Sequence, residues 1–257
     1  MTSAAPAAPV VALRGVRVRY RRRGAFARGS IDAVRGVDLE IASGETLGLV
    51  GESGSGKSTL ARVALGLLQP AAGEALLDGA PLTGRDPRGG ALAVVFQHPE
   101  WALNPRLRCS TSVLEPLAVR KVDAGARRER LQAILSDVGL DPALADRYPG
   151  ELSGGQRQRM AIARALVTRP RFVVFDEAVS ALDVSVQSQI LNLIRRLQDE
   201  HRFAALFISH DLAATRYVAH RIAVMREGAL VEVAPAAAFY GEPAHPYSRA
   251  LRASIEA

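Results

Sequence analysis

Cysteine is almost absent from the 257 residues, because Cys109 is the only one. A lone cysteine excludes an internal disulfide and a cluster held by several thiolates. No uninterrupted apolar stretch approaches the roughly 20 residues of a transmembrane helix. Residues 1–9 are rich in Ala and Pro and lack the charged and apolar regions of a signal peptide. We therefore expect a disordered tail over residues 1–9 and a folded chain in a reducing, cytoplasmic setting.

Positive charge is in excess, and the formal net charge is +7. Such a charge could suit nucleic acid or an anionic membrane surface. Much of it lies in two local clusters, at residues 14–23 and 120–130, which is equally typical of a solvated basic face. We therefore predict no nucleic-acid binding from the charge.

The most informative stretch combines a strand, a glycine-rich loop and a helix. Residues 46–50 are a short apolar run, and the apolar spacing of residues 59–68 is helical. Between them, residues 51–58 match G-x-x-x-x-G-K-[ST], the phosphate-binding P-loop. Because this loop has a strand before it and a helix after it, a chance match is a poor explanation.

The residue types in this loop suit a triphosphate. Gly51, Gly54 and Gly56 allow the backbone to curl so that consecutive N–H groups point inward. The positive end of the following helix faces the same point. Lys57 would supply a charge for the β- and γ-phosphates, and Ser58 a hydroxyl for Mg²⁺.

Alternating apolar and charged residues at 16–20 and 37–41 predict two half-buried antiparallel strands. Tyr20 ends the first of them. Its ring could pack in the core or stack on a nucleotide base, because an aromatic face binds a purine without a fixed set of hydrogen bonds. Spacing alone supports the two interpretations equally.

Residues 91–96 predict another apolar strand, and Gln97 follows its C-terminal end, where ligands collect in open α/β sheets. An amide at this point could ligate Mg²⁺ or orient a water. The chain then changes character, and we expect a helical insert over about residues 99–168. The loop at residues 98–106 contains the only tryptophan, Trp101. Packing is the default interpretation of this residue, and an interaction site is the alternative.

A second glycine-rich turn, Leu-Ser-Gly-Gly-Gln at residues 152–156, opens a helix predicted over residues 157–168. Ser153 is a suitable N-cap. Gly154 and Gly155 leave backbone N–H groups bare at the helix N-terminus, which could bind an anion. An ordinary glycine-rich helix start is the alternative. One chain has no evident use for two phosphate sites unless two chains share nucleotides.

A run of large apolar residues at 172–175, directly after Arg171, ends in two acids, which is typical of a central parallel strand. Asp176 could hold Mg²⁺ through water, and Glu177 could polarise the attacking water as a general base. A surface pair of acids is the alternative, and the apolar run argues against it.

The rest of the chain continues the alternation of helices and strands. His210 follows a buried strand and is a candidate contact for a γ-phosphate or a water, and Asp211 is expected to cap the next helix. The predicted elements are a turn at 180–183, a helix at 184–200, a strand at 203–209, a hairpin turning at 227–228, and a loop and short helix at 242–251.

Together these motifs resemble the nucleotide-binding subunit of ABC transporters, over essentially the whole chain after the tail. They stand in the expected order at residues 51–58, 97, 152–156, 172–177, 180–183 and 210. Three further stretches are similar to the dipeptide/oligopeptide/nickel import branch, at residues 96–106, 179–187 and 245–251. In that branch the ATPase sits at the cytoplasmic face of the membrane.

The resemblance implies ATP and Mg²⁺ as cofactors and two ATPase subunits that close head to tail on two ATP. The phosphates would be held by Gly51, Ser53, Gly54, Gly56, Lys57, Ser58 and Thr59. The γ-phosphate would be capped from the opposing subunit by Ser153, Gly154, Gly155 and Gln156.

The resemblance also assigns roles outside the glycine loops. Tyr20 would stack on adenine, and Asp183 would act across the dimer. The Mg²⁺ ligands would be Ser58 and Gln97, with Asp176 in support. The catalytic residues would be Glu177 as base, His210 at the γ-phosphate, and Gln97.

The implied partners are two transmembrane permease subunits, a second ATPase that is a sibling or a copy of this chain, and indirectly an extracytoplasmic solute-binding protein. The helical insert and the loop after Gln97 would transmit closure to the permeases. The implied fold is α/β, with a P-loop NTPase core (a mostly parallel sheet and an antiparallel β subdomain) and a helical signature subdomain, in one ATPase domain over residues 10–257.

Two features depart from the branch. Ala178 stands where most members have Pro, which should loosen that turn slightly and tilts the solute weakly toward nickel. The tail lacks a cysteine-rich extension, so we expect no iron–sulfur cluster.

Three other functions are alternatives to an importer of peptides or metal chelates. A soluble ABC ATPase acting on nucleic acid or ribosomes would need two ATPase halves or a long coiled-coil insert, and the sequence has neither. An exporter ATPase shares the ATP chemistry and is disfavoured only by the stretches at 104–106 and 245–251. A non-catalytic partner is disfavoured because Glu177 and the signature are intact.

Overall fold

Residues 8–21, 30–83, 89–99 and 102–253 are described by the structure, a computed structural model. They belong to two units, Met1–Asp86 with Ala204–Ala257, and Pro87–Phe203. Within the described ranges, no helix is long and apolar enough to cross a membrane.

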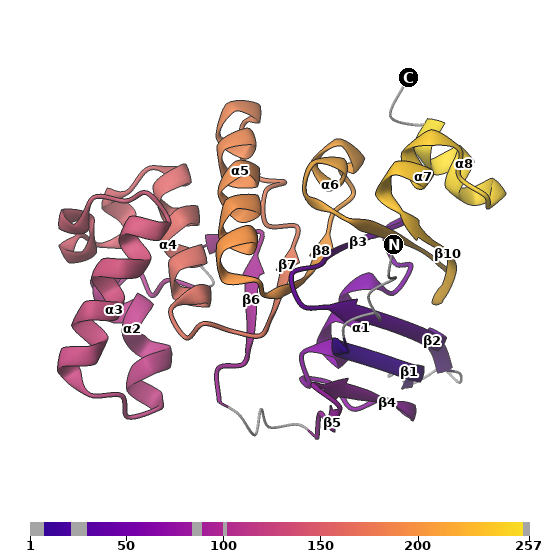
Figure 1. Ribbon diagram of the computed structural model, residues 1–257, viewed down its shortest axis with the longest axis horizontal. Helices are drawn as coiled ribbons and strands as arrows, with labels where there is room; N and C mark the ends of the chain where they lie inside the picture. The colour runs from indigo at the N-terminus through magenta and orange to yellow at the C-terminus, as the bar shows by residue number, and fades with distance from the viewer. Residues whose placement is uncertain (1–7, 22–29, 84–88, 100–101, 254–257) are drawn as a thin grey trace, which may run out of the picture. The chain divides into compact units, whose positions relative to one another are not determined.

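The first unit contains strands β10, β9, β3 and β8, which lie side by side in that order (Figure 1). β3 (Thr46–Val50) is parallel to β8 (Ala204–Ile208) and to β9 (Arg221–Arg226), whereas β10 (Ala229–Pro235) is antiparallel to β9. Every residue of β3 and β8 is buried, as expected for strands covered on both faces. The parallel pairing brings the C-terminal ends of β3, β8 and β9 to one edge.

A second sheet of this unit is antiparallel, in the order β2-β1-β4-β5. Its strands are β1 (Pro9–Arg21), β2 (Ser30–Ala42), β4 (Ala72–Leu77) and β5 (Ala80–Pro81). Along β2, buried Val37, Leu39 and Ile41 alternate with exposed Asp38 and Glu40. The predicted antiparallel pair is confirmed, and the mostly parallel sheet beside an antiparallel one confirms the predicted fold class.

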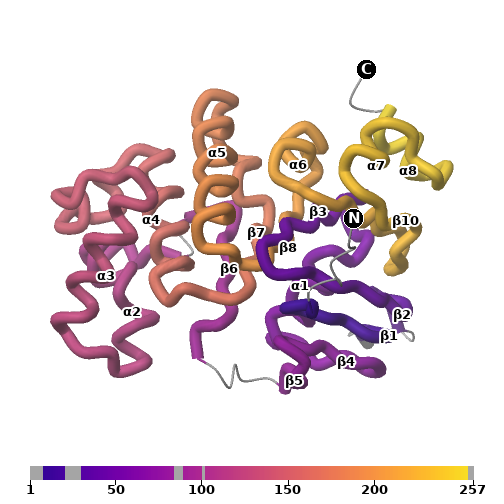
Figure 2. The backbone as a smooth tube through the Cα atoms, viewed as in Figure 1, coloured from indigo at the N-terminus to yellow at the C-terminus, as the bar shows by residue number. Residues whose placement is uncertain are grey.

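The described part of the first unit also contains the helices α1 (Lys57–Ala64), α6 (Leu212–Val218), α7 (Ala236–Gly241) and α8 (Pro246–Ala253). Asp211 caps α6 as predicted, because its carboxylate accepts hydrogen bonds from the N–H groups of Ala213 (2.8 Å) and Ala214 (3.0 Å). Figure 2 shows α7 and α8 next to β10 at the end of the chain.

The C-terminal helices are fixed by an apolar cluster. Phe239 of α7 is fully buried with Val50, Leu212, Ile222 and Val224. The rings of Tyr240 and Tyr247 and the side chain of Leu251 pack against this cluster from outside. The end of the chain is therefore part of the core that surrounds β3 and β9.

The second unit contains the parallel strands β6 (Leu92–Phe96) and β7 (Phe172–Asp176). Its helices are α2 (Cys109–Val119), α3 (Ala124–Asp137), the short 3₁₀ helices η2 (Pro142–Asp146) and η3 (Pro149–Glu151), α4 (Gly154–Leu166) and α5 (Val184–His201). The predicted helical insert, residues 99–168, lies within this unit. The buried face of α5, at Ile190, Leu191, Ile194 and Leu197, is the one its apolar spacing predicts.

Element boundaries differ from the sequence predictions at a few places. α4 begins at Gly154, three residues before the predicted start at 157, because Ser153 caps it directly. β1 already begins at Pro9, and residues 1–7 of the predicted tail lie outside the described residues. Helix α7 was not predicted, since Ala-rich residues 236–241 carry no clear period.

Replacing Phe239 with Ala should lower the free energy of unfolding by about 3–5 kcal/mol, because a fully buried ring leaves a cavity. Chemical denaturation of the full chain measures this. Leu67→Ala is the control, since this side chain is 70% exposed, and it should change stability by less than about 0.5 kcal/mol. Equal effects of the two changes would show that the C-terminal helices do not pack on the core.

Candidate nucleotide-binding and hydrolysis site

The P-loop between β3 and α1 passes very close to neighbouring main chain. A Cβ atom on Gly51 would lie 2.1 Å from the Met225 carbonyl oxygen of β9, and one on Gly56 would lie 2.3 Å from the Ala33 carbonyl oxygen of β2. Both glycines also have positive φ values, 144° and 109°. These positions therefore exclude any side chain, for steric as well as conformational reasons.

Lys57 bends back over the loop. Its Nζ donates hydrogen bonds to the carbonyl oxygens of Gly51 (2.7 Å) and Glu52 (2.8 Å), and the residue is 8% exposed. The ammonium group is thus held at the loop that the sequence predicts to cradle phosphates. Among the other predicted contacts, Ser53, Gly54 and Ser58 are exposed and Thr59 is half-buried.

The loop is supported from the C-terminal part of the first unit. The Gly228 N–H, in the turn between β9 and β10, donates to the Ser55 carbonyl oxygen at 2.9 Å. In the sheet, Leu49 pairs with Ile208 and Val50 with Val224. His210, which is exposed and follows β8, therefore lies at the same sheet edge as the P-loop.

Tyr20 lies near the end of β1, opposite Ile31 of β2. Its side chain is 40% exposed, which disfavours the interpretation of Tyr20 as a core residue. Stacking on a base remains a prediction. The basic loop between these strands, at residues 22–29, lies outside the described residues, as do Glu100 and Trp101.

Gln97, Asp176 and Glu177 come together at one edge of the β6–β7 pair. Phe96 is in register with Asp176, so that Gln97 and Glu177 leave the ends of neighbouring parallel strands. All three polar side chains are half-buried. Glu177 has a φ value of 51°, in the left-handed region that a non-glycine residue rarely adopts. Such strain persists only where surrounding contacts hold it.

Two side-chain hydrogen bonds hold the main chain at and directly after the strained residue. The Glu177 carbonyl oxygen accepts a bond from the Ser180 hydroxyl at 2.9 Å. The Ala178 carbonyl oxygen accepts one from Nε2 of Gln158, at 2.7 Å. Gln158 is completely buried and belongs to α4. Sequence reasoning missed Gln158, because an amide two residues beyond a known motif carries no signal of its own.

The signature turn at residues 153–156 has the geometry of a capped helix start. The Ser153 hydroxyl accepts a bond from the Gln156 N–H (3.3 Å), and Oε1 of Gln156 accepts one from the Ser153 N–H (2.9 Å). This reciprocal pair is a capping box, which confirms Ser153 as the predicted N-cap. Gly154 is exposed and Gly155 is half-buried at the N-terminus of α4.

A pocket of about 380 Å³ joins the signature turn to the turn before α5. Residues 153–156 line one part of it, and Ala181, Leu182 and Asp183 line another. Asp183 caps α5, because its carboxylate accepts a bond from the Val186 N–H at 2.9 Å. That bond, with a second from the Ser185 hydroxyl, holds the pKa of Asp183 below its ordinary value, so the group is ionised at neutral pH.

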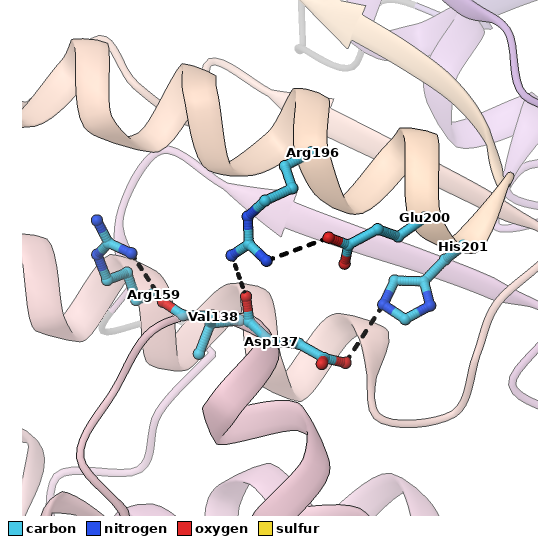
Figure 3. A network of polar contacts seen from close by, with 6 residues as sticks. All are labelled: Asp137, Val138, Arg159, Arg196, Glu200 and His201. Carbon is cyan, nitrogen blue, oxygen red and sulfur yellow. Dashed lines mark hydrogen bonds and ion pairs between the residues drawn. The ribbon is translucent and has the colours of Figure 1, made fainter.

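A polar network ties the end of α3 to α4 and to α5 (Figure 3). Arg159, which also lines the signature pocket, donates to the Val138 carbonyl oxygen at 2.7 Å. Arg196 of α5 donates to the Asp137 carbonyl oxygen, and the Asp137 carboxylate lies 3.3 Å from Nε2 of His201. Burial, followed by the charge of Arg196, lowers the pKa of Arg159. The end of α3 is thereby tied to both neighbouring helices.

The donor set suits a nucleotide with Mg²⁺ better than a metal held by protein alone. Within the described ranges, no group of three or more His, Cys, Asp and Glu side chains could hold a metal ion. Mg²⁺ commonly uses one or two side chains together with phosphate oxygens and water. The Ser58 hydroxyl, which is exposed at the start of α1 directly after the P-loop lysine, fits that requirement.

Taken together, the strand–loop–helix unit and the polar sheet edges define a P-loop ATPase. The family model described as ABC transporter matches residues 34–180, and this chain belongs to that family. It is an ATPase whose hydrolysis is coupled to transport.

Several relatives and solved structures are similar. The oligopeptide transport ATP-binding protein OppF of Bacillus subtilis (strain 168) is 45% identical over 237 residues, which cover 89% of this chain and 77% of that protein. The glutathione import ATP-binding protein GsiA of Salmonella choleraesuis (strain SC-B67) is 44% identical over 96% of this chain and 41% of its own length. The ATP-binding cassette MJ0796, whose dimer was solved bound to ADP and Pi, is 29% identical with a TM-score of 0.74, covering 88% of this chain and 98% of that one.

Replacing Gly51 with Ala should weaken MgADP binding at least ~10-fold, because the methyl group forces the loop away from the Met225 carbonyl. Titration calorimetry on the full chain measures the affinity. Gly79→Ala is the control, since Gly79 also has a positive φ, of 76°, but open space around its Cβ position. It should lower stability and leave MgADP affinity unchanged; equal binding losses would contradict the steric explanation.

Replacing Gln158 with Leu should lower the ATPase kcat ~10-fold or more, because the Ala178 carbonyl, directly after Glu177, loses the hydrogen bond that holds it. Gln198→Leu is a matched control, as another buried glutamine of the same unit that bonds a backbone carbonyl, that of Phe203. Both changes should lower stability by ~1 kcal/mol. If both lowered kcat equally, Gln158 would have no role beyond stability.

Proposed function

We propose that this chain powers the import of peptides through partner permeases, as one of two ATPase subunits at the cytoplasmic face of the membrane. The observation that carries the solute class is its 45% identity to an oligopeptide transport ATP-binding protein over 89% of the chain. The relative named as a glutathione import ATP-binding protein supports the same class, because glutathione is a tripeptide. Nickel or a metal chelate is the second candidate, and only Ala178 favours it.

In the proposed mechanism the first unit binds the nucleotide. The inward N–H groups of the P-loop and the Lys57 ammonium group neutralise the β- and γ-phosphates. The Ser58 hydroxyl and the Gln97 amide would hold Mg²⁺, with Asp176 in support, and the bound ion would draw charge from the phosphates. Tyr20 stacks on the adenine.

Hydrolysis needs a base and a contact to the transferred phosphoryl group. Glu177 accepts a proton from the attacking water as it approaches the γ-phosphorus. His210 contacts the γ-phosphate. The left-handed φ of Glu177, with its carbonyl held by Ser180, supports this role, because such strain is often retained at functional sites.

The signature turn supports a head-to-tail dimer. Residues 153–156 present a capped helix N-terminus, suited to an anion, in a pocket shared with Asp183. We propose that this pocket receives the γ-phosphate of the ATP bound by the opposing subunit. One chain then carries two glycine-rich anion sites because each nucleotide is shared between two subunits. Closure of the two subunits on ATP would be transmitted to the permeases.

Uptake assays in cells lacking this subunit test the proposal. Loss of labelled dipeptide uptake, with labelled nickel uptake retained, is the expected result. The parental chain should restore uptake, whereas Glu177→Gln should not, because its ATP turnover should fall by ~100-fold or more.

Glu129→Gln is the matched control, as an exposed acid on α3 of the same unit that should restore uptake. Loss of nickel uptake alone would make the chain part of a metal importer. Restoration by Glu177→Gln would show that Glu177 is not the base.

A further inference from the structure

The C-terminal segment at residues 245–251 has no assigned part in ATP binding, yet it is firmly attached to the nucleotide-binding unit. The Glu232 carboxylate of β10 accepts hydrogen bonds from the N–H groups of Ala244 (2.9 Å) and His245 (3.0 Å). Nδ1 of His245 accepts one from the Tyr247 N–H, at 3.1 Å. These bonds fix the first turn of α8, and with it the place of Tyr247.

The Tyr247 ring lies between the core and a cation. It packs against the apolar cluster around Phe239. The Arg226 guanidinium, at the end of β9, lies 4.8 Å from the ring centroid, within the range of a cation–π contact. A phenylalanine could make both contacts, so neither of them requires a hydroxyl group.

The hydroxyl group reaches the P-loop. The Glu52 N–H, at the first position after Gly51, donates to the Tyr247 hydroxyl oxygen at 3.2 Å. The carbonyl oxygen of the same Glu52 accepts a hydrogen bond from Nζ of Lys57, at 2.8 Å. One residue of the loop is therefore held by the tail through its N–H and by the phosphate-binding lysine through its carbonyl.

We propose that Tyr247 is a positioning residue for nucleotide binding, which holds the start of the P-loop in the conformation that places Lys57. The C-terminal segment at residues 245–251 then supports the nucleotide site although it lies outside the P-loop motif. The inference rests on the proposed role of the P-loop and Lys57 in binding the phosphates.

The ionisation state of the hydroxyl is compatible with this role. Burial raises the pKa of Tyr247, and the charge of Glu52 raises it further, against the lowering effects of the Glu52 N–H and of Arg226. The hydroxyl therefore stays protonated at neutral pH, and its oxygen accepts the Glu52 bond over the whole physiological range.

Tyr247→Phe tests the proposal by removing only the hydroxyl oxygen. Its matched control is Tyr240→Phe, which removes a hydroxyl of the same tail that donates to the Leu212 carbonyl of α6 at 2.7 Å instead of bonding a P-loop residue. For each full-length variant, titration calorimetry gives the Kd for MgADP, thermal unfolding gives Tm, and amide hydrogen exchange is followed at Glu52 without nucleotide.

We expect Tyr247→Phe to raise the Kd for MgADP about 3- to 10-fold, as the loss of one hydrogen bond predicts, and to speed exchange at Glu52. Tyr240→Phe should lower Tm and leave the Kd for MgADP and the exchange rate at Glu52 unchanged. Parental Kd and parental exchange in Tyr247→Phe would overturn the proposal, as would equal changes in Kd for the two variants.

The exchange measurement separates this inference from the proposed function. Suppose that the parental chain does not bind MgADP, but that exchange at Glu52 is faster in Tyr247→Phe and not in Tyr240→Phe. That result would support the role of Tyr247 in holding the loop and would overturn the role of the P-loop in nucleotide binding.

Discussion

The close approach of the P-loop to the main chains of β2 and β9 is the constraint on which the nucleotide site depends. Gly51 and Gly56 leave no room for a Cβ atom, because the carbonyl oxygens of Met225 and Ala33 occupy that space. Once the loop is in this position, Nζ of Lys57 can reach the carbonyl oxygens of the loop itself. A loop that begins at Gly51 thus depends on β9 and on the turn at Gly228, which come much later in the sequence.

In the second unit, side chains likewise hold the backbone that carries the residues proposed for hydrolysis. Glu177 adopts a left-handed conformation; Ser180 holds its carbonyl, and buried Gln158 holds the carbonyl of the next residue, Ala178. Since Gln158 belongs to the helix that starts at the signature turn, a buried hydrogen bond links the segment that carries the proposed base to the segment proposed to cap a second nucleotide. A hydrogen bond in a fully buried place is well suited to such a link, because water cannot compete for it.

Much of the fold could be predicted because its signals are local. The apolar runs at residues 46–50 and 172–175 mark buried parallel strands, and alternation along β2 marks a half-exposed one. The P-loop and signature residues are recognisable because each motif contains, within eight residues, the groups that its chemistry requires. Gln158, Tyr247 and helix α7 were not predicted to matter, since the partners of both side chains lie far away in the sequence and the helix has no marked apolar period.

By itself, the sequence determined the class of chemistry: a phosphate-binding loop, a candidate base after a buried strand, and a second anion site that points to a dimer. Only the tertiary structure decided which residues support those groups. It placed the Tyr247 hydroxyl on the Glu52 N–H and the Gln158 amide on the Ala178 carbonyl. The physical reason is that a motif records the groups that contact a ligand at short spacing, whereas a supporting contact depends on the path of the folded chain, which brings distant residues within hydrogen-bonding distance.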